Sequence, residues 1–393
     1  METQTQFFRD TWVEINLDKL SYNVSQCKRH LPEGINIFAV VKANAYGHGD
    51  LQTAKTALNS GARGLAVAFL DEALSLRENG ITAPILVLGA TRPEDVHIAV
   101  EHEISLTVFN KEWLAEAATY LEEEEILSLH VKCDTGMGRI GIRSEEELKE
   151  VEEAISQTNK YIFEGIFTHF ATSDETESVY FHHQLKRFNQ LIEVLDISPK
   201  YIHSANSAAS LRFEDSYYNT VRLGIAMYGL SPSLEMKPLL PYKLKQVFSL
   251  HTRVVHIKQL PAGEKVSYGA TYESKTDEWI ATLPIGYADG WLRRLQGQEV
   301  LINGERVPIV GRICMDQCMI KLPREVPLGT KVTLIGEQGT EYISIDEVAQ
   351  QLDTINYEIP CLISNRVPRI YIQSGEPIEV SNKLLTSSGF LKG

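Results

Sequence analysis

Short apolar runs alternate with longer amphipathic stretches through roughly the first 240 residues, and this alternation constrains the fold more than any other feature. Each run is too short for a helix, and several lack polar residues, as strands buried on both faces do. Repeated strand–helix units predict a parallel sheet covered by helices. The expected strands are residues 37–43, 64–69, 85–89, 105–109, 127–133, 163–169, 201–206 and 221–225.

The stretches between these runs carry the start and stop signals of helices. The clearest helical patterns cover residues 50–61, 71–80 and 144–156. The first two end on Gly61 and Gly80, and glycine commonly terminates a helix because it adopts a left-handed backbone freely. Ser144 followed by Glu147 has the spacing of a capping box at a helix start.

Eight consecutive units, at spacings of roughly 20 to 40 residues, are typical of an α/β fold with a closed eight-stranded (β/α)8 barrel. The alternative is an open doubly wound sheet, which usually carries a G-x-G-x-x-G motif after its first strand. No such motif follows residues 37–43. We therefore predict a TIM-type barrel over residues 13–245.

After residue 245 the pattern changes to strands with few helices. Asn303-Gly304 separates two strand-like runs and is a strong hairpin signal, and one clear helix covers residues 343–352. The expected strands are residues 247–257, 279–287, 299–302, 305–312, 318–322, 331–336 and 366–372. We predict a mainly antiparallel β domain over residues 246–393, and residues 1–12 are candidates to join it.

Composition excludes several classes of protein. The chain has 393 residues, 43% of them hydrophobic, and its 38 basic and 52 acidic residues give a net charge of −14. This charge argues against nucleic acid and anionic membranes as main partners. The sequence shows no signal-peptide pattern and no apolar run of the roughly 18 residues that a membrane helix needs. The five cysteines include no C-x-x-C pair, so we expect a cytoplasmic protein with reduced thiols and no metal.

Lys42 ends the apolar run FAVVK and precedes the segment ANAYGHG. A lysine beside buried apolar residues is costly unless it is paired, reaches solvent or is chemically modified. One interpretation is a side chain that leaves the strand end for solvent. The other is a Schiff-base lysine, because desolvation lowers the pKa of an amine and frees it as a nucleophile.

Polar residues gather at the ends of four further expected strands. Active sites of this barrel type lie at the carboxyl ends of the strands, and phosphate commonly binds after the seventh and eighth strands. One histidine or arginine at a strand end is usually only a partner of its neighbours, but five strand ends with such residues favour a site. The residues are Lys42, Lys132, Asp134, Arg139, His169, His203, Asn206, Ser207, Arg222, Gly224 and Tyr228.

Three segments stand out in the second domain: KVSYGATY with Tyr268, GRICMDQCMI with Met315, and NYEIP with Tyr357. Each also has an ordinary interpretation as a strand aromatic, a core residue or a packing residue. Other motifs are absent from the sequence. TGMGRIG lacks the G-K-[ST] ending of a P-loop, the histidines lack an H-E-x-x-H context, and no G-x-S-x-G elbow occurs.

Together these segments resemble the alanine racemase family, whose members are pyridoxal-phosphate enzymes with a barrel and a C-terminal β domain. AVVKANAYGHG around Lys42 is similar to the family's cofactor-lysine signature. DTGMGR, HSANSA, RLGIAMYG, SYGATY and CMDQ follow in the family's order, so the resemblance covers nearly the whole chain. No residue that the family uses for chemistry departs from the pattern.

The resemblance implies that Lys42 holds pyridoxal phosphate as an internal aldimine. It also implies that Arg222 faces the pyridine nitrogen. A guanidinium stays protonated and cannot give that nitrogen a proton, so the cofactor is a weaker electron sink and racemisation is favoured over transamination. The implied cofactor-binding residues are Lys42, Tyr46, His169, Ser207, Arg222, Gly224, Ile225 and Tyr357.

The resemblance further implies a two-base mechanism that interconverts L-alanine and D-alanine. Lys42 takes the proton from D-alanine, and Tyr268 takes it from L-alanine. We expect the phenolate form of Tyr268 to be stabilised by His169 and Arg222.

Arg139 and the backbone of Met315 are implied to hold the substrate carboxylate. The resemblance also suggests a carbamate on Lys132 that steadies Arg139, and a head-to-tail homodimer in which Tyr268, Met315 and Tyr357 come from the partner. The sequence alone leaves open whether Tyr268 is supplied by the same chain or by the partner.

Three alternatives remain at this point. The first is a relative with another substrate, such as a serine racemase or a basic amino-acid decarboxylase, although Tyr268 and Tyr357 are expected to favour a methyl group. The second is a non-catalytic cofactor carrier, which would lack the second domain. The third is a pure interaction protein, which would not need the strand-end residues. The role, as supply of a cell-wall precursor (D-alanine biosynthesis) or as alanine catabolism, also stays open.

Overall fold

The computed structural model describes residues 7–385. They form two compact units. The barrel unit comprises residues 20–45 and 50–245, and the β unit comprises residues 7–19, 46–49 and 246–385. The barrel unit thus lacks residues 13–19 and 46–49 of the range expected from the sequence.

Eight parallel strands form the wall of the barrel unit, in the order β8-β7-β6-β5-β4-β3-β2-β9. Their bounds are β2 (Asn36–Val40), β3 (Gly64–Val67), β4 (Ile85–Val87), β5 (Ile104–Val108), β6 (Leu127–Lys132), β7 (Tyr161–Phe167), β8 (Tyr201–His203) and β9 (Thr220–Leu223). The two end strands of this order, β8 and β9, are linked by a backbone hydrogen bond. The N–H of Arg222 on β9 donates to the carbonyl of Ala205, which follows β8, at 2.9 Å. The predicted (β/α)8 barrel is confirmed.

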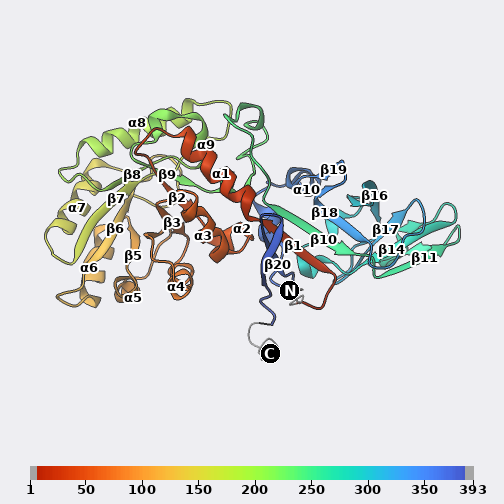
Figure 1. Ribbon diagram of the computed structural model, residues 1–393. Coiled ribbons are helices and arrows are strands. Elements are labelled where there is room, and N and C mark those ends of the chain that lie inside the picture. Colours follow the sequence, from red (N-terminus) through yellow and green to blue (C-terminus); the bar gives the residue numbers. More distant parts are fainter. Residues whose placement is uncertain (1–6, 386–393) are drawn as a thin grey trace. The chain divides into compact units, whose positions relative to one another are not determined.

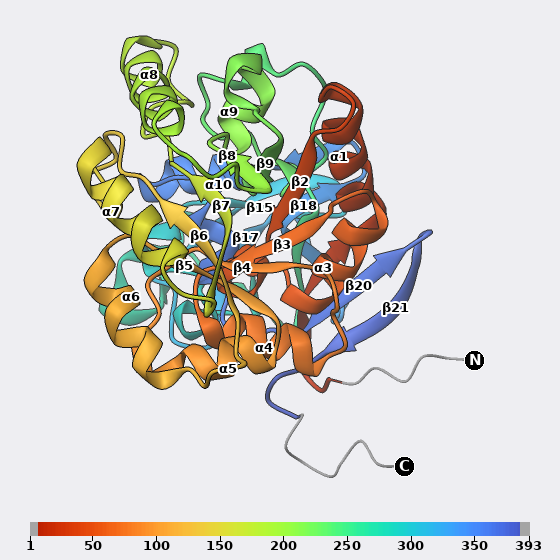
Figure 2. The same ribbon diagram turned by 90° about the vertical axis from the view of Figure 1, so that its left-hand side faces the viewer.

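Helices surround these strands on the outside (Figure 2). Their bounds are α1 (Leu17–His30), α3 (Asp50–Asn59), α4 (Leu70–Glu78), α5 (Val96–Glu101), α6 (Lys111–Ala117), α7 (Glu145–Ser156), α8 (Val179–Glu193) and α9 (Ser207–Arg212). The predicted cap of α7 is present, because the Ser144 hydroxyl accepts a hydrogen bond from the Glu147 N–H. Leu148, Val151 and Ile155 form the buried face of this helix. The 3-10 turns of the unit are η1 (Pro93–Asp95), η2 (Ala118–Tyr120), η3 (Glu214–Ser216), η4 (Ile225–Tyr228) and η5 (Lys237–Leu239).

The β unit is built on one large, mainly antiparallel sheet, as predicted (Figure 1). Its strand order is β11-β14-β17-β16-β15-β18-β10-β1-β20-β21, with β19 paired to β18. The bounds are β1 (Thr11–Asn16), β10 (Phe248–Arg253), β11 (His256–Leu260), β14 (Glu278–Leu283), β15 (Glu299–Ile302), β16 (Glu305–Val310), β17 (Cys318–Leu322), β18 (Lys331–Gln338), β19 (Glu341–Ile343), β20 (Arg369–Gln373) and β21 (Glu376–Ser381). A separate two-stranded ribbon pairs β12 (Lys265–Val266) with β13 (Tyr272–Glu273).

The hairpin between β15 and β16 turns at Asn303 and Gly304, whose φ angles of 51° and 78° fit a tight two-residue turn. The helix α10 (Ile345–Leu352) follows Ser344, which caps it, and α11 (Glu358–Leu362) is a further short helix. The single strand expected over 247–257 is instead divided into β10 and β11. These two strands have different neighbours, because β10 pairs with β1 and β18 whereas β11 pairs with β14. The 3-10 turns are η6 (Tyr268–Ala270), η7 (Tyr287–Asp289) and η8 (Arg293–Leu295).

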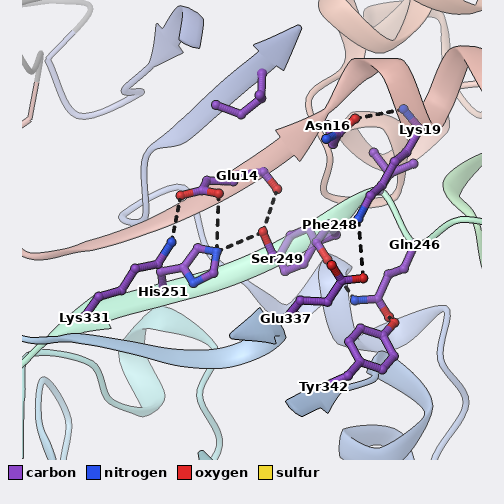
Figure 3. Close-up of a pocket in the computed structure, with 13 residues that line it drawn as sticks. Glu14, Asn16, Lys19, Gln246, Phe248, Ser249, His251, Lys331, Glu337 and Tyr342 are labelled. Carbon is purple, nitrogen blue, oxygen red and sulfur yellow. Dashed lines mark hydrogen bonds and ion pairs between the residues drawn. The ribbon is translucent and has the colours of Figure 1, made fainter. Parts of the chain in front are cut away.

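A polar cavity of about 180 Å³ lies within the β unit (Figure 3). Glu14 lines it, and its carboxylate lies 3.5 Å from His251 Nε2 and 3.3 Å from Lys331 Nζ. Burial raises the pKa of Glu14, but the contacts with His251, Trp12 and Lys331 outweigh burial and lower the pKa to about 2. The side chains of the cavity thus satisfy one another.

Within residues 7–385, no helix combines the length and the apolar character that a membrane span requires.

Candidate active site

Lys42 follows β2 and opens a left-handed turn, the segment α2 (Lys42–Tyr46). The next four residues, Ala43, Asn44, Ala45 and Tyr46, have φ angles of 53°, 52°, 52° and 53°. This conformation costs about 1–2 kcal/mol for each non-glycine residue. Strain of this kind persists only where the surroundings enforce it, and it is concentrated at functional sites.

Several hydrogen bonds hold the end of β2 and the start of this turn. The Glu72 carboxylate accepts from the Ala43 N–H at 2.6 Å and from the Ala68 N–H at 2.7 Å, so it links the ends of two neighbouring strands. The Tyr228 hydroxyl donates to the Val40 carbonyl at 2.9 Å. These contacts fix the backbone from which the Lys42 side chain projects.

Ser207 and Gly224 meet at the ends of β8 and β9. Ser207 is 4% exposed, and its hydroxyl accepts from the Gly224 N–H at 2.8 Å and from the Ala226 N–H at 3.4 Å. Gly224 precedes Ile225, where the turn η4 begins. A hydroxyl and backbone N–H groups therefore converge where barrels of this type commonly bind phosphate.

Arg222 lies on β9 with its side chain buried in the barrel. Its five hydrogen bonds use the two terminal nitrogens, and the acceptors are His203 Nδ1, His169 Nδ1 and the carbonyls of Thr168, His203 and Ser204. Within residues 7–385 the Nε–H of Arg222 makes no hydrogen bond, so an acceptor atom of a ligand could bind it. Burial, with Arg139 adding to it, lowers the pKa of Arg222 to about 9, and the group stays protonated at neutral pH.

His169 follows β7, and its Nδ1 accepts a hydrogen bond from Arg222 Nη2 at 3.3 Å. Burial and the positive charge of Arg222 hold the pKa of His169 well below its usual value. The imidazole is therefore neutral. Its proton lies on Nε2, because the nitrogen that accepts from a guanidinium carries none.

Lys132 ends β6 and is 3% exposed. In the described part of the chain its Nζ has no hydrogen-bond partner, and it lies 4.7 Å from the centre of the Phe167 ring. Burial and the charge of Arg222 hold the pKa of Lys132 well below its usual value. A neutral, buried amine of this kind is nucleophilic.

Arg139 lies in the loop that follows, and its side chain is exposed. The Asp134 carboxylate shapes this loop by accepting from the N–H groups of Gly136 and Gly138 at 3.1 and 2.9 Å. The loop therefore presents a guanidinium on a backbone that is fixed by its own aspartate.

Tyr46, Tyr268, Met315 and Tyr357 belong to the β unit. Tyr46 and Tyr357 have ring centres 6.1 Å apart. Tyr268 is 67% exposed and Met315 is 53% exposed, which is unusual for large apolar side chains. The structure thus brings the first two residues together and leaves the other two open to solvent within this chain.

Glu72, His130 and Glu164 were not predicted as site residues from the sequence. For Glu72 a signal was present, because a glutamate at the third position of a helix often bonds the backbone ahead of that helix. For His130 and Glu164 the relevant partners lie on other strands, and nothing in the sequence identifies them.

Comparison with known proteins agrees with this geometry. Family models described as "Alanine racemase, N-terminal domain" and "Alanine racemase, C-terminal domain" match residues 15–232 and 247–371. The chain is 60% identical to alanine racemase of Geobacillus kaustophilus over 377 residues, which are 96% of this chain and 98% of the relative. The chain belongs to the alanine racemase family.

Two solved structures show how far this similarity extends. The crystal structure of alanine racemase from Bacillus anthracis with bound L-Ala-P is 56% identical, with a TM-score of 0.94 over 97% of this chain and 99% of that chain. A histidine racemase from Leuconostoc mesenteroides is 33% identical, with a TM-score of 0.88 over 93% of this chain and 98% of that chain. The alanine racemase fold therefore also carries activity on a larger amino acid.

Alanine racemases use pyridoxal phosphate, and the residues of the barrel unit fit that group. Lys42 offers an amine at a strand end, and Ser207 offers a hydroxyl beside the backbone N–H groups at Gly224. The Nε–H of Arg222 suits a pyridine nitrogen, which accepts one hydrogen bond. The chain is a pyridoxal-phosphate-dependent racemase.

Proposed function

We propose that this chain interconverts L-alanine and D-alanine. The observation that carries the proposal is the buried guanidinium of Arg222, which stays protonated at neutral pH and would donate a hydrogen bond to the cofactor's ring without giving up its proton. A ring nitrogen that is not protonated withdraws fewer electrons from the substrate, so the substrate carbon takes a proton back promptly. Prompt return of the proton to the same carbon is what racemisation requires, whereas transamination requires the proton to go elsewhere.

Pyridoxal phosphate, when bound, draws electrons from the substrate's Cα–H bond and so makes that proton acidic. Lys42 would hold it covalently, while the Ser207 hydroxyl and the backbone at Gly224 and Ile225 would hold its phosphate. The hydroxyls of Tyr46 and Tyr357 are the further phosphate contacts that we propose. His169, as a neutral imidazole beside Arg222, would pack near the ring without adding charge.

Lys42 and Tyr268 are the two bases in this proposal, one for each face of the substrate. The Lys42 amine removes the Cα proton of D-alanine, and the Tyr268 phenolate removes that of L-alanine. In each direction the opposite group returns a proton to Cα. Each turnover therefore leaves one base with an added proton and the other without one, and proton exchange with solvent restores both. The 67% exposure of Tyr268 supports a role at a surface that is completed by another group.

Arg139 and the backbone of Met315 would bind the substrate carboxylate. We propose that Lys132 reacts with carbon dioxide: its Nζ bonds to the carbon, one carbon–oxygen electron pair moves to oxygen, and the amine proton leaves to solvent. The buried, unpaired amine of Lys132 supports this step, and the resulting anion would offset the charges of Arg139 and Arg222.

A homodimer with shared active sites is part of the proposal. Tyr268 and Met315 lie exposed on the β unit, as expected for residues that a partner's barrel covers. We further propose a cytoplasmic location, where D-alanine would be made as a cell-wall precursor or alanine would be degraded.

A serine racemase is the second candidate, since a relative of similar fold acts on an amino acid other than alanine. The decisive test measures D-isomer formation from L-alanine and from L-serine, with pyridoxal phosphate present and absent. We expect cofactor-dependent racemisation of alanine at a kcat/KM at least tenfold above that for serine. Equal values, or a higher value for serine, would refute the assignment of alanine.

A further inference from the structure

A line of hydrogen bonds crosses the interior of the barrel from Arg222 to Glu164. Arg222 Nη1 and His203 Nδ1 are 2.9 Å apart, and His203 Nε2 and His130 Nδ1 are also 2.9 Å apart. His130 Nε2 then lies 3.4 Å from a carboxylate oxygen of Glu164. His130, His203 and Arg222 are all at most 3% exposed, so water does not compete for the bonds among these three residues.

The direction of every bond in this line follows from Arg222. A guanidinium has donors only, so His203 Nδ1 accepts and its proton lies on Nε2. That proton is donated to His130 Nδ1, which places the proton of His130 on its own Nε2. His130 therefore donates to Glu164, and both imidazoles are neutral, as their burial also favours.

The two ends of this line of hydrogen bonds carry opposite charges. None of the five acceptors of Arg222 is a carboxylate, although the guanidinium is charged and buried. The carboxylate of Glu164 is the negative group at the far end of the line, where Ser105 and Lys200 also donate to it at 2.7 and 3.2 Å. Two neutral imidazoles thus join a buried cation to its counter-charge.

The backbone of β7 is adapted to this arrangement in two ways. Leu129 pairs with Phe163 and His130 pairs with Gly165, so Glu164 is the extra residue of a β-bulge. A Cβ atom on Gly165 would lie 2.4 Å from His130 Nδ1. Because the φ angle of Gly165 is not positive, glycine is required here for the space that the imidazole fills and not for its backbone freedom.

Aromatic rings hold both imidazoles in place. His203 stacks on Phe167 at 4.8 Å with an interplanar angle of 5°, and His130 stacks on Tyr201 at 5.7 Å and 21°. The rings therefore have little freedom to rotate, and a change at Glu164 acts on Arg222 through hydrogen bonds and not through repacking.

We propose that Glu164 is a positioning residue for Arg222 and acts through His130 and His203. It accepts the hydrogen bond at the far end of the line whose tautomers Arg222 sets, offsets the charge of Arg222, and so helps to hold the Arg222 Nε–H where the pyridine nitrogen of the cofactor would accept from it. The part that concerns the cofactor rests on the proposed function, whereas the tautomers are a property of the protein alone.

The first test is nitrogen-15 NMR of the histidine rings in the cofactor-free protein. We expect His130 and His203 both to be neutral with the proton on Nε2. In Glu164→Gln the acceptor of the His130 Nε2–H becomes a neutral amide oxygen, so the tautomers set by Arg222 stay but the Nε2 resonance of His130 shifts. A proton on Nδ1 of either ring in the native protein, or unchanged spectra in the variant, would overturn the proposal.

The second test measures the dissociation constant of pyridoxal phosphate by visible absorbance. Glu164→Gln removes the charge, and Gly165→Ala displaces His130 without altering a polar group. We expect each change to weaken cofactor binding about tenfold, and the double variant to be no weaker than either single variant, because both interrupt the same line. Additive effects would contradict the mechanism.

The matched control is Glu14→Gln, which alters the other carboxylate–histidine pair, with His251 in the β unit (Figure 3). We expect its cofactor affinity to stay within twofold of the native value, and an equal loss in Glu14→Gln and Glu164→Gln would overturn the proposal. If Gly165→Ala fails to fold, Glu164→Gln and the control still decide. A native protein that shows the expected tautomers but does not racemise alanine would contradict the proposed function and leave the tautomer assignment standing.

Discussion

The carboxylate of Glu72 accepts a hydrogen bond of 2.6 Å from the backbone N–H of Ala43, the residue that follows the candidate cofactor lysine. Ala43 is the first of four non-glycine residues in the left-handed conformation. A charge-assisted hydrogen bond of this length is among the stronger contacts available to a backbone N–H. Glu72 therefore helps to enforce a conformation that the sequence of the turn disfavours.

Glu72→Gln is expected to weaken cofactor binding about tenfold. A hydrogen bond to a charged group contributes roughly 1.5–3 kcal/mol, and its loss lets the turn relax and move Lys42. Titration of the cofactor-free variant with pyridoxal phosphate measures the effect. Glu78→Gln, an exposed change on the same helix, is the control, and equal affinities of the two variants would contradict the role of Glu72.

Lys42→Ala is expected to reduce racemisation at least about 10³-fold, since the change removes a proton-transfer group and the covalent attachment of the cofactor. Borohydride treatment of the native protein should fix the cofactor on a peptide that contains Lys42. Formation of D-alanine from L-alanine measures the first effect, and mass spectrometry of the digested protein locates the fixed cofactor. Labelling of another lysine would show that Lys42 has a different role.

Tyr268→Phe is expected to act on one direction only. Exchange of the Cα proton of L-alanine in heavy water should fall by about 10²–10⁴-fold, the usual contribution of a general base, while exchange from D-alanine continues. Proton NMR of each isomer measures the two rates. Tyr272→Phe is the control on the neighbouring strand, because its hydroxyl bonds Glu278. Equal losses for both isomers in Tyr268→Phe would contradict the assignment of faces.

A carbamate on Lys132 is expected to give one carbon-13 NMR signal in protein equilibrated with labelled bicarbonate. The signal should disappear in Lys132→Ala and persist in Lys200→Ala. A native spectrum without such a signal would leave Lys132 as a buried neutral amine.

Glu164→Gln is also expected to change the acid stability. Burial raises the pKa of Glu164, but its contacts, with His130 and Ser105 foremost, outweigh burial and lower the pKa from 4.5 to about 2. A lowered pKa contributes stability that is fully present above pH 4.5 and is lost as the pH falls toward 2. The shift corresponds to at most about 3 kcal/mol, at 1.36 kcal/mol per pKa unit.

Urea unfolding at several pH values tests the direction in which the contribution of Glu164 to stability changes with pH. The free energy of unfolding of Glu164→Gln should lie below the native value near pH 7, and the two values should converge as the pH falls toward 2. A difference between the two proteins that grows on acidification would contradict the assigned pKa.

The sequence predicted those parts of the fold that local pattern determines. The barrel strands, the cap at Ser144 and the turn at Asn303 and Gly304 all depend on residues close together in the chain, and all are confirmed. The division of residues 247–257 into β10 and β11 was not predicted, because it follows from pairing with strands that are distant in sequence.

In the candidate site, too, some features follow from local sequence and others depend on residues that are distant in the chain. Strand ends identified Arg222 and Ser207, since the barrel gathers the carboxyl ends of its strands on one side. The left-handed turn after Lys42 could not be predicted, because alanine and tyrosine ordinarily avoid that conformation. Glu164 was not predicted as a site residue, because in the sequence it has no feature that distinguishes it from other strand residues. Its partner follows only from the β-bulge and from the packing of Gly165 against His130.

The position of β1 has a consequence for synthesis of the chain. This strand is synthesised before the other described elements, yet it hydrogen-bonds on one side to residues 248–252 and on the other to residues 369–372. At ~5–20 residues per second, β1 waits on the order of 20–70 seconds before both neighbours exist. The barrel strands can pair during that interval, so the β unit is completed after the barrel unit.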